Sequence, residues 1–142
     1  MKHLTIFFFA TFVLIFCNNQ NKKSMATIDN ENLIKKAYLA FNSRNIDEAL
    51  STFHSDVQWP KAFEGGYVNG HDEIRKYWTR QWTEINPIVE PVEIKQRPDG
   101  LLEVTVHQVV KDLQGKLIFD GKVKHIFTLK DNLLRKMDIE AE

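Results

Sequence analysis

Residues 66–78 read GYVNGHDEIRKYW, and within this stretch the chain changes from a glycine-punctuated loop to a helix. Gly66 and Gly70 bracket the loop, because glycine adopts backbone conformations that other residues avoid. From about Asp72 onward, apolar residues recur at intervals of three and four, which predicts a helix that continues to Ile85. The inner stripe of this helix consists of Ile74, Tyr77, Trp78, Gln81 and Ile85.

Two more helices are predicted on the amino-terminal side of this stretch. Asp29 is a suitable cap for the first, because its carboxylate accepts hydrogen bonds from free backbone amides. The apolar positions of that helix have helical spacing: Leu33, Ile34, Ala37, Tyr38 and Phe41. Residues 42–45 interrupt it, a short helix follows from Ile46 to Phe53, and residues 57–59 are predicted to form a brief strand.

The carboxyl-terminal half alternates between strands and turns. Strands are predicted over Ile88 to Gln96, Leu101 to Asp112, Leu117 to Leu129 and Leu133 to Ile139. Turns rich in Gly, Pro, Asp and Asn separate them, as is typical of hairpins. Three helices followed by a four-stranded antiparallel meander predict an α+β domain.

The charge of the chain is balanced overall but unequal along its length. The 142 residues include 19 Lys and Arg against 19 Asp and Glu. Residues 1–24 contain three lysines and no acid, so the rest of the chain has 16 basic and 19 acidic residues. A nucleic-acid-binding protein needs a basic surplus to displace counterions from phosphates. We therefore expect no nucleic-acid partner.

The sequence indicates neither a metal site nor a cofactor site. One cysteine, Cys17, excludes an intrachain disulfide and a zinc site with several cysteines. The five histidines lack the spacing of metal ligands, and no glycine-rich motif is suited to a phosphate group. Catalysis in this chain, if present, is therefore expected to be cofactor-free.

The first 17 residues differ in character from everything that follows. A basic start at residues 1–3 precedes an apolar run from Leu4 to Phe16, which ends at Cys17. This run is too short for a bilayer-spanning helix of about 20 residues, but it matches the core of a secretory signal. A polar stretch follows at residues 18–24. The segment resembles a bacterial lipoprotein signal, in which the cysteine after the apolar core receives lipid.

That resemblance implies a division of the chain and a location. Residues 1–17 would be the signal peptide, residues 18–28 a flexible tether, and residues 29–142 the domain. Lipid on Cys17 would anchor the protein in the bacterial cell envelope and would be its only membrane contact. If Met25 is instead the true start, the domain is expected in the cytoplasm.

Four motifs in the domain occur together in one superfamily. They are Ala40-Phe41-Asn42, residues 53–59 (FHSDVQW), residues 66–78 quoted above, and residues 131–137 (DNLLRKM). On these motifs the domain resembles the NTF2-like superfamily, and within it the SnoaL-like branch. The resemblance implies a cone, in which a curved, mainly antiparallel sheet packs around three helices and leaves a pocket at its wide end. Isomerases, cyclases and non-catalytic ligand binders share this fold, so the fold does not give the activity.

Strand alternation predicts which polar residues face the pocket. Successive side chains point to opposite faces of a sheet. The set Val104, Val106, Gln108 and Val110 is apolar except for Gln108, so it is assigned to the concave face. In the next strand His125 points inward, and in the last strand Met137 does. His125 and Gln108 therefore form the polar pair expected inside the cone, with His125 as an acid or base or as a core histidine.

Aromatic residues supply further candidates for the pocket wall. Trp59, Tyr67, Trp78 and Trp82 are predicted to bind a flat or cyclic apolar ligand together with Gln108 and Met137. Asp56, where the chain enters the first strand, is a candidate assisting base, with a turn or cap role as the preferred alternative.

These features leave three hypotheses for function. The first is binding of a small, largely apolar or cyclic molecule in the pocket. The second is a cofactor-free lyase, isomerase or hydrolase with His125 as acid or base, assisted by Gln108 and Asp56. The third is an interaction module that forms a homodimer through the outer sheet face, with Thr105, His107, Val109 and Ile126 at the interface.

Overall fold

The structure of the protein, a computed structural model, describes residues 10–142, with the side chains of Lys22 and of residues 25–142. Its elements follow one another in this order: α1 (Ala10–Asn42), α2 (Ile46–Leu50), β1 (Phe53–Pro60), β2 (Tyr67–Asn69), α3 (Gly70–Gln81), β3 (Ile85–Gln96), β4 (Leu102–Asp112), β5 (Leu117–Lys130) and β6 (Leu133–Ala141). Helices precede a run of long strands, which confirms the predicted α+β class.

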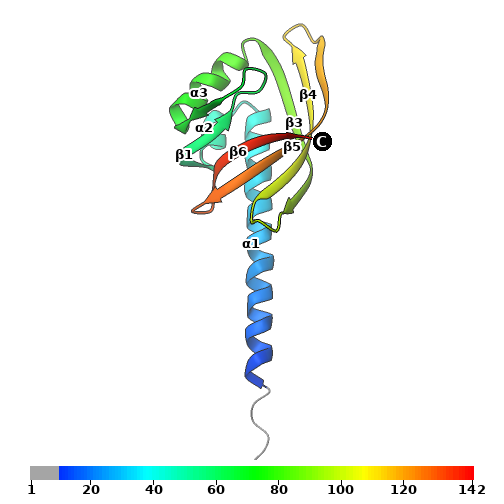
Figure 1. The fold of residues 1–142 in the computed structure, drawn as a ribbon. Coiled ribbons are helices and arrows are strands. Elements are labelled where there is room, and N and C mark those ends of the chain that lie inside the picture. The colour runs from blue at the N-terminus through cyan, green and yellow to red at the C-terminus, as the bar shows by residue number, and fades with distance from the viewer. Residues whose placement is uncertain (1–9) are drawn as a thin grey trace, which may run out of the picture.

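The first helix is much longer than predicted. α1 has 33 residues, and its amino-terminal part projects from the domain (Figure 1). Asp29 lies inside it and not at its start, and residues 18–28, the predicted tether, are helical. No Gly or Pro occurs from Ala10 to Asn42, so nothing in this sequence breaks the helix. The side chain of Cys17, the predicted lipidation site, lies outside the described residues. Within the described chain, no helix combines the length and the apolar character that crossing a membrane requires.

The six strands form one sheet in the order β2-β1-β6-β5-β4-β3. The predicted four-stranded meander is thus extended by two strands, since β1 pairs in parallel with β6 and antiparallel with β2. Register shifts interrupt the ladders of all four long strands, and such bulges bend a sheet. The curved sheet packs around the carboxyl-terminal part of α1, while α3 lies against β1 and β2 (Figure 1). The result is the predicted cone.

Two element boundaries around the opening motif differ from the prediction. Residues 67–69, predicted as loop, form β2 because they pair with Gln58, Trp59 and Pro60 of β1. α3 ends at Gln81 and not at Ile85, because Ile85 already pairs with Asp112 of β4. Tertiary pairing thus overrides the helical spacing of the last turn.

Asn42, the last residue of α1, joins this helix to the edge of the sheet. Its Nδ2 donates to the backbone oxygen of Val89 at 2.8 Å, and its Oδ1 accepts from the backbone N–H of Val89 at 3.0 Å. β3 is an edge strand, so Asn42 takes the place that a further strand would have.

We expect Asn42→Ala to lower the free energy of unfolding by about 2 kcal/mol. The change leaves both backbone groups of Val89, a residue that is only 6% exposed, without their partner. Urea unfolding followed by circular dichroism measures the effect. Asn42→Asp keeps the acceptor but loses the donor, and should destabilise at least as much. A cost below about 0.5 kcal/mol for Asn42→Ala, the range of ordinary surface changes, would contradict the role of this contact.

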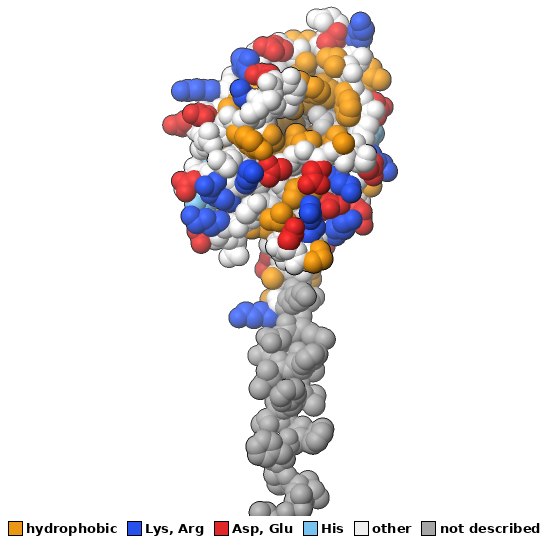
Figure 2. Space-filling view, in the orientation of Figure 1, with side chains coloured by type: hydrophobic (Ala, Val, Ile, Leu, Met, Phe, Trp, Pro, Cys, Tyr) orange, Lys and Arg blue, Asp and Glu red, His pale blue; other side chains and the backbone are white. Residues whose placement is uncertain are grey.

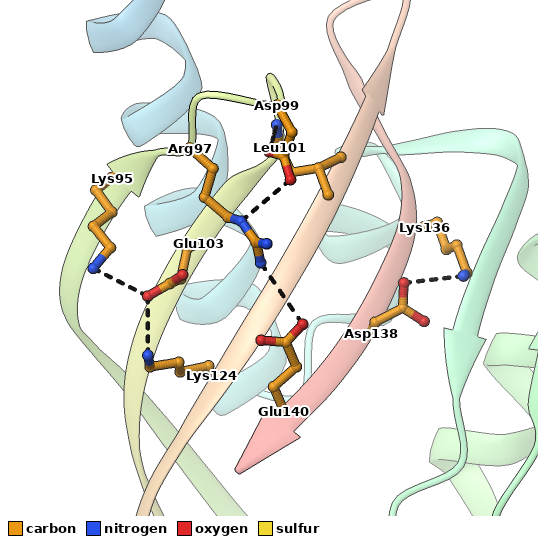
Figure 3. A network of polar contacts seen from close by, with 9 residues as sticks. All are labelled: Lys95, Arg97, Asp99, Leu101, Glu103, Lys124, Lys136, Asp138 and Glu140. Carbon is orange, nitrogen blue, oxygen red and sulfur yellow. Dashed lines mark hydrogen bonds and ion pairs between the residues drawn. The ribbon is translucent and has the colours of Figure 1, made fainter. Parts of the chain in front are cut away.

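The outer face of the sheet carries a network of ion pairs (Figure 3). Glu103 of β4 lies between Lys95 of β3 at 3.1 Å and Lys124 of β5 at 3.4 Å. Of the residues predicted for a dimer interface, Thr105 and Ile126 are buried within this layer, and the His107 imidazole contacts the Asp120 carboxylate at 2.6 Å. Charged side chains, and not a bare apolar patch, therefore dominate this face.

Candidate functional site

The cone encloses a pocket of about 670 Å³, part of which is open to solvent. Figure 2 shows hydrophobic side chains gathered around a hollow on the face of the domain in view. Of the described residues that line the pocket, none is an Asp, Glu, Lys or Arg. An uncharged lining disfavours a charged ligand, because a buried charge needs a partner.

Aromatic rings form a large part of the pocket wall. Eight aromatic residues contribute to it, from α1, β1, the loop after β1, α3 and β5: Tyr38, Phe41, Phe53, Trp59, Phe63, Tyr77, Trp78 and Phe127. Trp59 stacks on Phe53 with ring centroids 5.1 Å apart, and it meets Trp78 edge-on at 5.2 Å. These contacts fix the orientation of Trp59 and Trp78, two of the three indoles predicted for the site.

His125 is the histidine of the pocket, as strand alternation predicts. It is 4% exposed, and its Nδ1 lies 2.7 Å from the Tyr38 hydroxyl of α1. Burial lowers the pKa of His125 to about 4, so the ring is neutral at pH 7. Burial also raises the pKa of the Tyr38 hydroxyl well above its ordinary range. The pair is therefore a neutral hydrogen-bonded unit in the pocket wall.

Gln108 also lines the pocket, but it is not beside His125 as predicted. The register pairs His125 with Val104 and Gln108 with Gly121. Four residues of β4 separate the two positions, which corresponds to about 13 Å along a strand. Alternation predicts which face of the sheet a residue lies on, but not which residue of the neighbouring strand it lies beside. The predicted pairing of His125 with Gln108 is wrong for this reason. The two polar groups therefore belong to different parts of the pocket.

Three other predicted site residues line the pocket, and three do not. Trp59, Trp78 and Met137 contribute to the wall. Trp82 packs outside it, where its ring contacts Phe41 and lies beneath the Arg44 guanidinium, 4.9 Å from the ring centroid. Trp82 keeps a helical backbone conformation at the end of α3, where its backbone N–H donates to the Trp78 carbonyl at 3.0 Å, and it lies one position off the inner stripe.

Tyr67 and Asp56 point away from the pocket. Tyr67 is 44% exposed, and its hydroxyl donates to Asp138 of β6 on the outer face. Asp56 is exposed and precedes Val57, which is 1% exposed, so alternation along β1 turns the Asp56 carboxylate outward. Its backbone N–H donates to His54 Nδ1 at 3.1 Å, a local contact of the strand entry. Asp56 is therefore too far outside to assist His125.

The partner of His125 leaves no signal within a single helix or strand of the sequence. Tyr38 belongs to the apolar stripe of α1, which places it inside the domain but does not show what its hydroxyl meets. Phe63 was missed as well, because it lies in the loop between β1 and β2. It is 68% exposed yet lines the pocket, so it stands at the mouth. Its φ of 70° is unusual for a bulky residue.

Metal binding has no support in this part of the chain. Among the described residues, no group of three or more His, Cys, Asp or Glu side chains is arranged to hold a metal ion. The polar groups of the pocket wall come from side chains such as His125, Tyr38, Gln108 and Gln81, which suit hydrogen bonding to an uncharged ligand.

Comparison with solved structures identifies proteins of the same fold. An NTF2-like protein of unknown function from Burkholderia pseudomallei K96243 is 20% identical, over 80% of this chain and 91% of that one, with a TM-score of 0.70. TerC, crystallised with polyporic acid, is 25% identical over 80% of this chain and 92% of its own, with a TM-score of 0.69. A proposed polyketide cyclase from Xanthomonas campestris pv. campestris is 16% identical over 82% and 93%, with a TM-score of 0.66.

No curated protein matches the chain. A family model described as the SnoaL-like domain matches residues 34–136, from the inner part of α1 to β6. This match includes His125, Tyr38 and the whole opening motif. Together with the cone and its pocket, it shows that the chain belongs to the SnoaL-like domain family, with an NTF2-like fold.

Proposed function

We propose that the protein binds a small, uncharged, largely apolar molecule in the pocket of the cone. The observation that carries this proposal is a pocket with a wall rich in aromatic rings and no charged residue among those described in its lining. Flat or cyclic molecules suit such a wall, because rings pack against rings in stacked or edge-on contacts. TerC was crystallised with polyporic acid, which supports small-molecule binding by this fold.

A variant that fills the pocket tests this function. Ala37 of α1 lines the pocket and is 8% exposed, so Ala37→Phe places a ring in the space of the ligand. The uncharged probe N-phenyl-1-naphthylamine is expected to bind the unmodified protein with increased fluorescence. Ala37→Phe should weaken this binding at least tenfold, or about 1.4 kcal/mol.

The matched control is Leu39→Phe on the opposite side of the same helix. Leu39 is 71% exposed and does not line the pocket, so this variant should bind the probe like the unmodified protein. Both variants must first show cooperative unfolding. Failure of the unmodified protein to bind the probe, or equal binding by Ala37→Phe, would contradict a ligand-binding pocket.

Catalysis by His125 is a second candidate function, which the hydrogen bond between Tyr38 and His125 favours. An imidazole held in one orientation in a largely apolar pocket is a common device for proton transfer or for polarising a substrate. The lipid anchor at Cys17, the envelope location and the homodimer through the outer face stay predictions from the sequence. Segregation of the lysines of residues 1–24 from the acidic domain supports the anchor.

A further inference from the structure

We propose that Tyr38 holds His125 as the tautomer with its proton on Nε2, so that the pocket selects a ligand with an acceptor oxygen, such as a ketone or quinone carbonyl. This inference rests on the proposed ligand-binding function and names the chemical class of the ligand. It assigns His125 the role of a hydrogen-bond donor at a fixed place in the wall.

The position of the proton follows from the hydrogen bond between the two side chains. The Tyr38 hydroxyl lies 2.7 Å from His125 Nδ1, and among the described residues it has no other hydrogen-bond partner. If Nδ1 carried the proton and donated, the hydroxyl hydrogen of Tyr38 would have no acceptor among the described residues. A buried donor without a partner is costly. The hydroxyl therefore donates to the lone pair of Nδ1, and the ring proton lies on Nε2.

The second nitrogen of the ring is left for the ligand. Among the described residues, none bonds to Nε2 of His125. Among the described side chains, Nε2 is also absent from the buried polar atoms that have no hydrogen-bond partner, which include Trp78 Nε1 and Trp82 Nε1. His125 Nε2 thus keeps contact with the cavity that its side chain lines. Its N–H is free to donate to a group inside the pocket.

The surroundings of His125 favour an uncharged acceptor over an anion. Its ring is inclined by 21° to that of Tyr38, with centroids 5.9 Å apart, and meets Phe127 edge-on at 6.3 Å. No Arg or Lys lies in the described lining to balance a negative charge. A carbonyl oxygen accepts from a neutral N–H without needing such a balance. In this tautomer Nε2 has no lone pair, so it does not act as the base that the sequence suggested.

The tautomer is measurable in the protein without any ligand. Long-range ¹H–¹⁵N correlation spectra of uniformly ¹⁵N-labelled protein at pH 7 distinguish a protonated from an unprotonated ring nitrogen. We expect His125 to show protonated Nε2 and unprotonated Nδ1. Tyr38→Phe removes the donor to Nδ1 and should give a mixture of the two tautomers. His107→Gln, on the outer face, serves as a control: it identifies the signals of His107 and should leave those of His125 unchanged. Protonated Nδ1 in the unmodified protein would overturn the proposal.

Ligand selection is tested with three molecules of one shape. Fluorene, 9-fluorenone and carbazole have, at the same ring position, a methylene group, a carbonyl acceptor and an N–H donor. Competition with N-phenyl-1-naphthylamine gives the ratio of the affinities for fluorenone and fluorene in each protein. This ratio should be about tenfold larger in the unmodified protein than in His125→Phe. His125 should not increase the affinity for carbazole, because carbazole offers a donor at that position and His125 Nε2 is itself a donor. The comparison between proteins cancels differences in solubility, and Tyr38→Phe, with its histidine intact, should reduce the preference in part.

The outcomes separate this inference from the function on which it rests. If none of the three molecules nor the probe binds, the proposed function fails and the ligand class fails with it. If they bind but His125→Phe leaves the fluorenone preference unchanged, or if His125 favours carbazole, the pocket binds ligands and the donor role alone is wrong. Equal binding of all three also overturns the donor role.

Discussion

Replacing Trp78 with alanine is expected to lower the free energy of unfolding by about 4 kcal/mol, within the range measured for large aromatic residues in cores. Trp78 is 1% exposed and lies where α3 meets β1 and α1. Its ring contacts four others: Phe41 at 5.0 Å, Phe53 at 5.8 Å, Trp59 at 5.2 Å and Trp82 at 5.8 Å. Alanine would join a new cavity to the existing pocket and leave these rings without support.

Two matched variants show whether size or position causes this effect. Trp78 Nε1 has no hydrogen-bond partner, so Trp78→Phe loses no hydrogen bond and should cost about 1 kcal/mol. Trp82→Ala, one turn later and half-buried, should cost about 2 kcal/mol. Guanidinium unfolding followed by far-ultraviolet circular dichroism avoids the loss of indole fluorescence. A cost for Trp78→Ala no greater than that for Trp82→Ala would contradict the central position of Trp78.

The features that depend on local periodicity within one helix or strand could be predicted well from the sequence. Alternation along β4 and β5 placed Gln108 and His125 on the concave face, because one buried face fixes which residues point inward. The stripe of the helix after Gly70 likewise placed Trp78 inside. In both cases neighbouring residues of one element carry the whole signal.

Features that depend on two distant elements could not be predicted in this way. The contact between Tyr38 and His125 joins residues 87 positions apart, and it depends on the rotation of α1 against β5. The parallel pairing of β1 with β6 likewise has no local signature. Trp82 lies one position off the inner stripe of α3, and the spacing of that stripe does not show whether such a residue faces the pocket or packs beside it.

The stability of the domain should fall on acidification by about 3 kcal/mol between pH 7 and pH 4 through His125 alone. Burial lowers the pKa of His125 to about 4 in the folded protein, whereas an unfolded chain has the ordinary value near 6.5. Between these values the unfolded chain binds the proton and the folded chain does not. The stabilising contribution is therefore complete above about pH 6.5 and is lost as the pH falls through about 4.

A comparison with His125→Gln isolates this contribution. Gln does not titrate, and its carbonyl oxygen is an acceptor for the Tyr38 hydroxyl. Urea unfolding at pH 7 and at pH 4 gives the acid-induced loss for each protein, and the other histidines and the carboxylates cancel in the difference. The unmodified protein should lose about 3 kcal/mol more than the variant. An equal loss would mean that His125 takes up its proton as readily in the folded domain as in the unfolded chain. The neutral ring that accepts the hydrogen bond from Tyr38 would then not persist at pH 4.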